Sequence, residues 1–466
     1  MISGLQAHEL HMALEAKGFS KVTKRPIRTT ARSSRKLQSE EMTPQLLPHE
    51  QLTFTDENQK NKSTDEELNS RYAKGDIRIV TESARYSLAG ILSMLQEKVS
   101  PEGKPDAPTE FRYKLDPEYQ RRHRWSDERK SRLIESFLMN VPVPPVFLYE
   151  RDLARFEVMD GRQRLTALSE FYENKFSLTG LQYWSDLEGR TYSQLPSKIR
   201  DGIDRRYISS IILLKETAAT DEQAALLKKI VFERLNSGGV KLSGQETRNA
   251  VYHGPLNALC LELSANKTFR KLWGIPAELE TTQFEDNDED SDTTGESTAS
   301  GIRMFEKMED VELVLRFFAY RQISGYKAGL NKITEFLDIF LMKGNNFPKR
   351  VLNNYRTMFN STIEFLWNAL GIDAFTIISD KKRQGRPSKI VYDSIMLIAS
   401  SPEIKAAHAK LLRNKSILRD ELISLYKRDQ AGAVPFFSGR RTNYVDTQKR
   451  DALIKEAFFN ALRKAK

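Results

Sequence analysis

The stretch that decides the fold is VFLYERDLARFEVMDGRQRLTALSEFY, residues 146–172. Two short runs rich in aromatic and β-branched residues, 146–149 and 156–159, lie on either side of a charged turn and predict two strands. After Asp160 and Gly161, apolar side chains recur at helical spacing, so a helix is expected to follow the letters DGRQR. The stretch therefore predicts two strands, a glycine turn and a helix in direct succession.

The same patterns outside this stretch predict the fold class. The run YISSIILL, residues 207–214, is the strongest strand signal in the chain. Two pairs of residues, Thr220 with Gln223 and Ser243 with Glu246, have the spacing of capping boxes that open helices. Helical spacing or caps further predict helices over 86–99, 126–140, 220–235, 303–321, 333–342, 348–370, 391–399, 403–412, 417–427 and 450–464. We expect an α/β (α+β) core followed by an all-helical C-terminal portion.

Composition suggests four regions. Residues 1–75 are polar, and eight Lys or Arg without any acid lie between Lys17 and Ser39, which predicts a disordered, basic N-terminal arm. The core is expected over 76–260 and the helical portion over 301–466. Between them, residues 276–300 contain the acidic run EDNDEDSDTTGE and predict a disordered insertion.

Charge and cysteine content exclude several classes. The formal net charge is +10, which favours a phosphate polymer such as DNA as a partner. The single cysteine, Cys260, rules out an internal disulfide framework and a Cys-rich zinc site, and its apolar neighbours predict a core position. No run approaches the ~20 apolar residues of a membrane span, and no secretory signal is evident, so we expect a cytoplasmic protein without membrane contact.

Three clusters combine basic, amide and aromatic residues: YQRRHRW at 119–125, DGRQRLT at 160–166 and FERLNSGG at 232–239. The second places two arginines and a glutamine in the first turn of the expected helix, where backbone N–H groups and the helix dipole favour an anion. Arginine adds a planar fork that holds phosphate bidentately. By itself the cluster also fits a surface helix with ion pairs, in which Asp160 orients an arginine or caps the helix instead of binding a metal.

Four blocks in this order resemble one family: 119–150, 158–171, 232–251 and 303–321. They are similar to the N-terminal domain of GmrSD-type modification-dependent restriction enzymes, within the ParB/sulfiredoxin-like superfamily. The resemblance implies a ParB-like fold with a DGQQR-type motif that handles nucleotides. Position by position, that motif falls on Asp160 to Arg164, and Arg162 replaces its first glutamine. This replacement adds a charge that can bind phosphate but removes an amide that could position water.

The resemblance also implies the roles of individual residues. The implied catalytic residues are Asp160, Gln163 and Arg164. The implied nucleotide-binding residues are Gln120, Arg121, Gly161, Arg162, Thr166, Arg234 and Asn236. The expected cofactors are an NTP and Mg²⁺, with Asp160 and Glu246 as metal ligands.

Three functions remain open at this point. The first is an NTP-binding module, with NTP hydrolysis as its further activity, that acts on DNA or is regulated by it in restriction or anti-phage defence. The second is a metal-dependent DNA endonuclease that uses the same site, and the third is a non-catalytic nucleic-acid-binding module. No GxxxxGK[ST] loop is present, and only His408 lies beyond residue 260 among the histidines, so neither a P-loop nor a His-Asn-His nuclease is expected. A separate nuclease subunit or domain would then be the partner that cuts.

Overall fold

The structure is a computed structural model of the chain. It describes residues 45–54, 64–74, 79–100, 109–115, 125–217, 220–235, 243–276, 298–327, 332–378, 385–432, 435–437 and 444–465. The basic cluster 17–39, the acidic run 285–296 and the site candidates Gln120, Arg121 and Asn236 lie outside the described residues.

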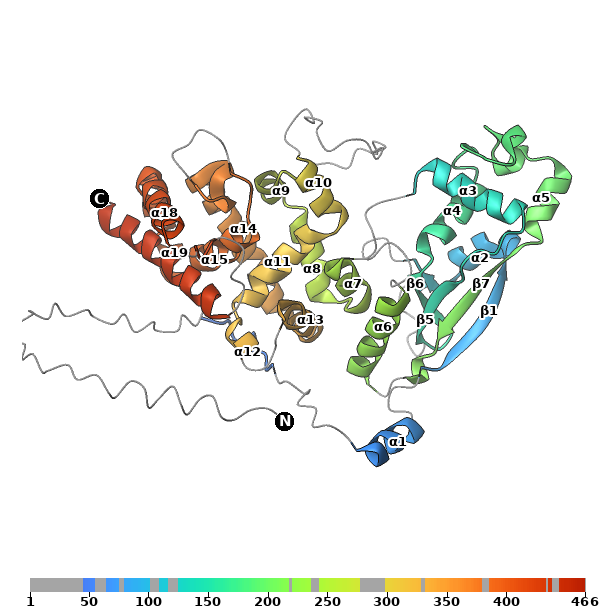
Figure 1. Cartoon of the computed structure of the whole chain (residues 1–466), viewed down its shortest axis with the longest axis horizontal. Coiled ribbons are helices and arrows are strands. Elements are labelled where there is room, and N and C mark those ends of the chain that lie inside the picture. Colours follow the sequence, from blue (N-terminus) through green and yellow to red (C-terminus); the bar gives the residue numbers. More distant parts are fainter. Residues whose placement is uncertain are drawn as a thin grey trace, which may run out of the picture. The chain divides into compact units, whose positions relative to one another are not determined.

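A five-stranded sheet with the order β1-β7-β5-β6-β4 lies at the centre of the N-terminal half (Figure 1). Strands β5 and β6 pair antiparallel, as the charged turn between them predicts, and β5 pairs parallel with β7. The edge strand β1 runs antiparallel to β7, and β4 runs parallel to β6. The strands are β1 (Thr81–Ser87), β4 (Tyr113–Lys114), β5 (Val146–Asp152), β6 (Arg155–Asp160) and β7 (Tyr207–Leu213), and a separate pair is formed by β2 (Lys98–Val99) and β3 (Glu110–Phe111).

Alternate residues of the central strands face opposite sides of the sheet, as the two-residue period of a strand requires. Val146, Leu148 and Val158 belong to a large buried cluster on one side, which the apolar residues of the neighbouring helices complete. Met159 and Leu213 belong to a smaller cluster on the other side. Both faces of the sheet are therefore covered where β5, β6 and β7 lie side by side.

Helices connect and cover these strands, and α2, α3 and α4 lie together on one side of them (Figure 1). Ser126 caps α3, and Asn140, with a φ of 58°, lies just beyond the end of that helix, where the sequence places its end. The helices of this half are α1 (Asp65–Lys74), α2 (Ile91–Gln96), α3 (Asp127–Leu138), α4 (Arg162–Tyr172), α5 (Ser197–Asp204), α6 (Asp221–Leu235) and α7 (Gly244–Val251).

The expected helix over 86–99 is wrong at its start. Strand β1 extends to Ser87, and Tyr86 pairs with Ile208 of β7. Helix α2 accordingly begins only at Ile91, after a short 3₁₀ turn. Tyr86 and Ser87 form a strand because they pair with β7, more than a hundred residues away. The local spacing of apolar residues does not reveal so distant a partner.

The C-terminal half consists of helices around one continuous apolar core, as expected from the sequence. Cys260 is fully buried in this core, as its neighbours predict. The helices are α8 (Pro255–Ser264), α9 (Lys267–Trp273), α10 (Ala299–Glu306), α11 (Glu309–Tyr320), α12 (Ser324–Lys327), α13 (Ile333–Gly344), α14 (Lys349–Leu370), α15 (Lys389–Ala399), α16 (Pro402–Ala406), α17 (His408–Arg413), α18 (Lys415–Gln430) and α19 (Tyr444–Lys464).

Two predicted helices of this half are each divided. The segment 303–321 forms α10 and α11, because Met308 adopts a φ of 55° that no α-helix accommodates. The segment 403–412 forms α16 and α17, which meet at Ala407. None of the described helices is both long enough and apolar enough to cross a membrane.

Residues 45–54 differ from the expected disordered arm, which the sequence places over 1–75. Glu50 is completely buried and Phe54 is 8% exposed, because both pack into the helical half. Helix α1 is a second ordered element in the same span.

Candidate functional site

The β6–α4 junction carries the central motif. Strand β6 ends at Asp160, Gly161 turns the chain with a φ of 95°, and α4 begins at Arg162. A Cβ atom on Gly161 would lie 2.5 Å from Cγ1 of the buried Val146. Glycine is therefore required here both for its backbone angle and for the close approach to β5.

Arg164 is held in place from two directions. Its Nη2 donates to Asp160 Oδ2 at 2.9 Å and to the carbonyl oxygen of Pro145 at 3.2 Å. The Asp160 side chain is 54% exposed, so this ion pair contributes at most about 1 kcal/mol of stability. The pair orients the guanidinium of Arg164. The sequence also allows Asp160 to cap α4, but the N-cap residue of that helix is Gly161.

One donor of Arg164 has no hydrogen-bond partner within the part of the chain that the structure describes. This donor is the buried Nε. A buried donor without a partner costs about 1–3 kcal/mol, and because protein atoms cover this Nε, a ligand would reach it only if the side chain moved. Arg162, Gln163 and Thr166 are half-buried in the first turns of the same helix. The junction thus combines a helix N-terminus and two arginines directly after a glycine turn.

The third cluster is packed against the same strand. Phe232 of α6 is 4% exposed and lies in one apolar cluster with Met159, the residue before Asp160. Lys228, one helical turn earlier, pairs with Glu157 of β6 at 2.8 Å and lies over the ring of Tyr149. Phe232 is therefore a core residue that fixes α6 on the sheet.

The structure brings only part of the predicted site together. Arg234 is exposed in the last turn of α6, two residues beyond Phe232. Its neighbour Asn236, and the first cluster with Gln120 and Arg121, lie outside the described residues. Convergence of the three clusters on one cleft stays a prediction.

Glu246 has a structural role in α7. Its Oε2 accepts from the backbone N–H of Ser243 at 2.6 Å, and the Ser243 hydroxyl accepts from the N–H of Glu246 at 3.1 Å. This is the capping box that the sequence predicts, and it occupies one oxygen of a carboxylate that is 5% exposed. Nowhere in the described ranges do three or more His, Cys, Asp or Glu side chains gather into a group that could hold a metal ion. A metal site made by Asp160 and Glu246 stays a prediction.

Residues 107–253 match the family model of the GmrSD restriction endonuclease, N-terminal domain, and are here called the GmrSD N-terminal segment. The resemblance seen in the sequence is confirmed for this segment, which extends from the strands before α3 to the end of α7. No curated protein and no solved structure shows a significant match to the chain.

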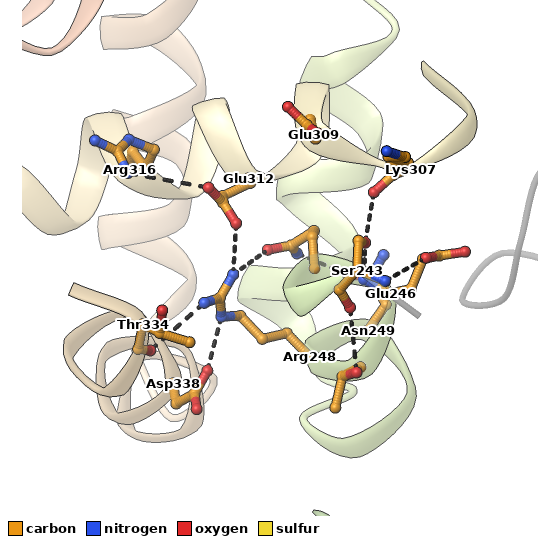
Figure 2. Close-up of polar contacts among 12 residues, drawn as sticks. Ser243, Glu246, Arg248, Asn249, Lys307, Glu309, Glu312, Arg316, Thr334 and Asp338 are labelled. Carbon is orange, nitrogen blue, oxygen red and sulfur yellow. Dashed lines mark hydrogen bonds and ion pairs between the residues drawn. The ribbon is translucent and has the colours of Figure 1, made fainter. Parts of the chain in front are cut away.

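The last helix of the GmrSD N-terminal segment carries a buried arginine that the sequence does not single out. Arg248 is 2% exposed, and its Nη1 lies 2.9 Å from Oε2 of Glu312 on α11. Its Nε lies 2.7 Å from Oδ1 of Asp338 on α13, so Figure 2 shows the guanidinium between two carboxylates. Both partners lie beyond residue 253, and Arg248 therefore attaches the GmrSD N-terminal segment to the helical half.

Two further arginines of the fourth block, Arg316 and Arg321, are also engaged in this half. Arg316 pairs with Asp393, and Arg321 pairs with Glu50. The partners of these arginines are distant in sequence, so no local pattern identifies them.

Proposed function

We propose that this chain is a nucleoside-triphosphate-binding module of a restriction or anti-phage defence system, with the triphosphate at the β6–α4 junction. The observation that carries the proposal is the glycine turn after β6, which places Arg162, Gln163 and Arg164 in the first turn of α4 at a helix N-terminus. The match of residues 107–253 to a restriction endonuclease domain supports the biological setting. The net charge of +10 supports DNA as the polymer that the system acts on.

Each residue of the junction has a role in this proposal. Arg162 and Arg164 neutralise phosphate charge, and Gly161 makes the turn that places them at the start of α4. Gln163 would position the attacking water if the nucleotide is hydrolysed, and Thr166 lies one turn further into the helix. Asp160 would hold Mg²⁺, which would supply further neutralisation of phosphate charge. The nucleotide state would then shift the helical half or recruit a nuclease subunit.

Isothermal titration of the full chain with each of the four NTPs, with and without Mg²⁺, tests the proposal. We expect binding of at least one NTP, and we expect Arg162→Ala to weaken it by about tenfold or more through the loss of a charge-assisted contact. Arg132→Ala is the matched control, because Arg132 is an exposed arginine on α3 that pairs with Glu128. Absence of binding by all four nucleotides would remove the proposal.

Gel shifts at several salt concentrations test the DNA partner separately. Binding that weakens steeply with salt would show phosphate contacts. A chain without residues 1–44 distinguishes binding by the basic N-terminal residues from binding by the remainder. Salt-dependent binding together with complete absence of NTP binding would favour the non-catalytic module instead.

The endonuclease alternative has its own decisive assay. Plain and modified plasmids are incubated with the chain and Mg²⁺ or Mn²⁺. We expect both plasmids to stay intact, because Glu246 is engaged in the cap of α7 and the described residues contain no metal-holding group. Cleavage that Asp160→Asn abolishes would establish the endonuclease instead.

A further inference from the structure

Residues 45–54, QLLPHEQLTF, form no helix or strand, yet they are packed against helices of the C-terminal half. Leu52 and its hydrogen-bond partner Gln322 are 270 residues apart in the sequence. In Figure 1 the blue trace of this segment lies beside α12. Leu47 to Glu50 make a turn, in which the N–H of Glu50 donates to the carbonyl oxygen of Leu47 at 3.1 Å and His49 has a φ of 67°. Residues 51–54 continue from it without a further turn.

The central contact of the segment is a carboxylate held by an arginine. Glu50 is completely buried, and its two oxygens accept from Nε and Nη2 of Arg321 at 2.6 and 2.9 Å. The hydroxyl of Tyr355 donates to the same carboxylate at 2.9 Å. A planar fork and a hydroxyl together select a carboxylate and exclude a neutral amide. Because Arg321 is only 5% exposed, removal of the acid would leave a buried charge uncompensated.

Side chains of the helical half also bind the backbone of the segment. Gln322 donates to the carbonyl oxygen of Glu50 at 2.6 Å and accepts from the N–H of Leu52 at 2.7 Å. Lys343 donates to the carbonyl oxygen of Thr53 at 2.8 Å. These bonds go to backbone atoms, so they do not depend on which side chains the segment carries. Other modes of peptide recognition use backbone bonds in the same way.

The second side chain of the segment in close contact with the helical half is Phe54. The ring of Phe54 lies 4.9 Å from the ring of Phe336, measured between centroids. A Cβ atom on Gly325 would lie 2.2 Å from the Phe54 ring, so the absence of a side chain at Gly325 makes room for it. The surface therefore recognises an aromatic residue four positions after the glutamate.

We propose that these helices form a peptide-recognition site and that residues 45–54 are its tethered ligand. The site, here called the Arg321 surface, consists of Arg321, Gln322, Gly325, Phe336, Lys343 and Tyr355. Its ligand is a peptide with a glutamate and, four residues later, a phenylalanine.

The segment contributes few side chains to the core of the helical half. Within the described residues, Phe54 is the one buried member of that core that precedes Val251, and Leu47 and Leu52 are partly buried against it. The other buried members lie between Val251 and Ala461. In the intact chain the tether keeps the local concentration of the ligand high, so an added peptide competes poorly.

The test uses the full chain with a specific protease site placed between Thr55 and Ser63. After cleavage, a fluorescently labelled peptide of residues 44–56 is titrated and its anisotropy is measured. We expect saturable binding, and at least about tenfold weaker binding of peptides with Glu50→Gln or Phe54→Ala. The Gln51→Ala peptide is the matched control, because Gln51 is exposed and should not contribute.

The outcomes are distinguishable. A cleaved chain that keeps its helical circular dichroism but does not bind the peptide would overturn the proposal. Equal binding of the Glu50→Gln peptide, or loss of the helical signal on cleavage, would also overturn it, since the segment would then be an integral part of the fold.

An uncleaved chain provides a second measurement. The variant Glu50→Gln with Phe54→Ala should bind the labelled peptide more tightly than the wild-type chain does, because its own segment competes less well. Adding Arg321→Gln should abolish that gain. A dimer formed by exchange of the segment between two copies would show the same recognition between molecules and would support the proposal, whereas an unchanged affinity in the double variant would contradict it.

Discussion

Arg248 on α7 and Asp338 on α13 form a buried ion pair, with Nε 2.7 Å from Oδ1. The other oxygen of Asp338 lies 2.5 Å from Nζ of Lys229 on α6. The neighbouring Lys228 pairs with Glu157 of β6, three residues before Asp160. Two adjacent lysines of α6 thus join the strand that carries the motif to the helices beyond the GmrSD N-terminal segment.

Removal of Arg248 should strongly destabilise the chain. Arg248→Ala removes the buried guanidinium that lies between Asp338 and Glu312 and leaves Lys229 as the only cation within 4 Å of Asp338 among the described residues. The loss of one partner of a buried pair costs up to about 3–5 kcal/mol. Chemical denaturation measures this cost. Arg356→Ala is the control, because its pair with Glu262 is exposed and should cost at most about 1 kcal/mol. Equal costs for the two variants would contradict a structural role for the Arg248 pair.

Gly161→Ala should be more harmful than a substitution at a comparable glycine. Gly161 and Gly189 both have positive φ, but an added Cβ meets Val146 at the first position and nothing within 4 Å at the second. We expect a cost of about 1 kcal/mol for Gly189→Ala and about 1–3 kcal/mol more for Gly161→Ala. Thermal unfolding of both variants checks the difference, and equal melting temperatures would show that the junction relaxes without loss.

Short-range chemistry explains why the sequence predicts the junction well. The two strands, the glycine turn and α4 follow from alternation and from residues within one turn of each other. The caps at Ser126 and Ser243 are equally local and are confirmed.

Contacts between distant residues explain the errors. Tyr86 forms a strand because β7 is available to pair with it, and Met308 breaks a helix that the apolar spacing continues. Arg248 and Glu50 have partners that only the folded chain brings near, so neither stands out in the sequence.

Glu135→Gln should destabilise the loop after α4 in a pH-dependent way. Burial alone would raise the pKa of Glu135, but hydrogen bonds from the backbone N–H groups of Tyr183, Trp184 and Gln182 lower it overall. A lowered pKa stabilises the fold above about pH 4.3, the value in the unfolded chain, and this stabilisation disappears as the pH falls through the folded-state pKa.

We therefore expect Glu135→Gln to cost about 1.5–3 kcal/mol at pH 7 and the difference in unfolding free energy from wild type to narrow only below about pH 4.3. Urea denaturation at pH 7, at pH 5 and in steps down to about pH 3 measures it. Glu188→Gln is the control, because the exposed Glu188 accepts one such bond, from Leu181. A cost that does not depend on pH would contradict the ionic contribution of Glu135.

Asp451→Asn should have the opposite pH dependence. Burial raises the pKa of Asp451 to about 7, although the nearby Ser394 hydroxyl and Arg450 lower it, and Asp393 raises it slightly further. The folded state keeps a proton that the unfolded chain loses near pH 3.9, so wild-type stability falls between about pH 4 and pH 7.

The asparagine variant does not carry this penalty. Relative to wild type, Asp451→Asn should gain about 1.4 kcal/mol per pH unit over that interval and keep the gain at higher pH. Denaturation curves at pH 5, 6 and 8 test this. A constant difference between the two proteins would show that Asp451 ionises normally in the fold.

Arg162→Gln should separate nucleotide binding from hydrolysis. The change creates the glutamine pair of the DGQQR-type motif and removes one positive charge from the first turn of α4. If the junction holds a triphosphate, binding should weaken by about tenfold, because a charge-assisted contact becomes a neutral one. Turnover of the bound nucleotide should rise, since an amide beside Gln163 can orient the attacking water. Single-turnover phosphate release measured at saturating nucleotide separates the two effects, and Arg132→Gln on α3 controls for the charge change. Weaker binding without faster release would show that Arg162 only neutralises phosphate, whereas unchanged binding would place the triphosphate away from α4.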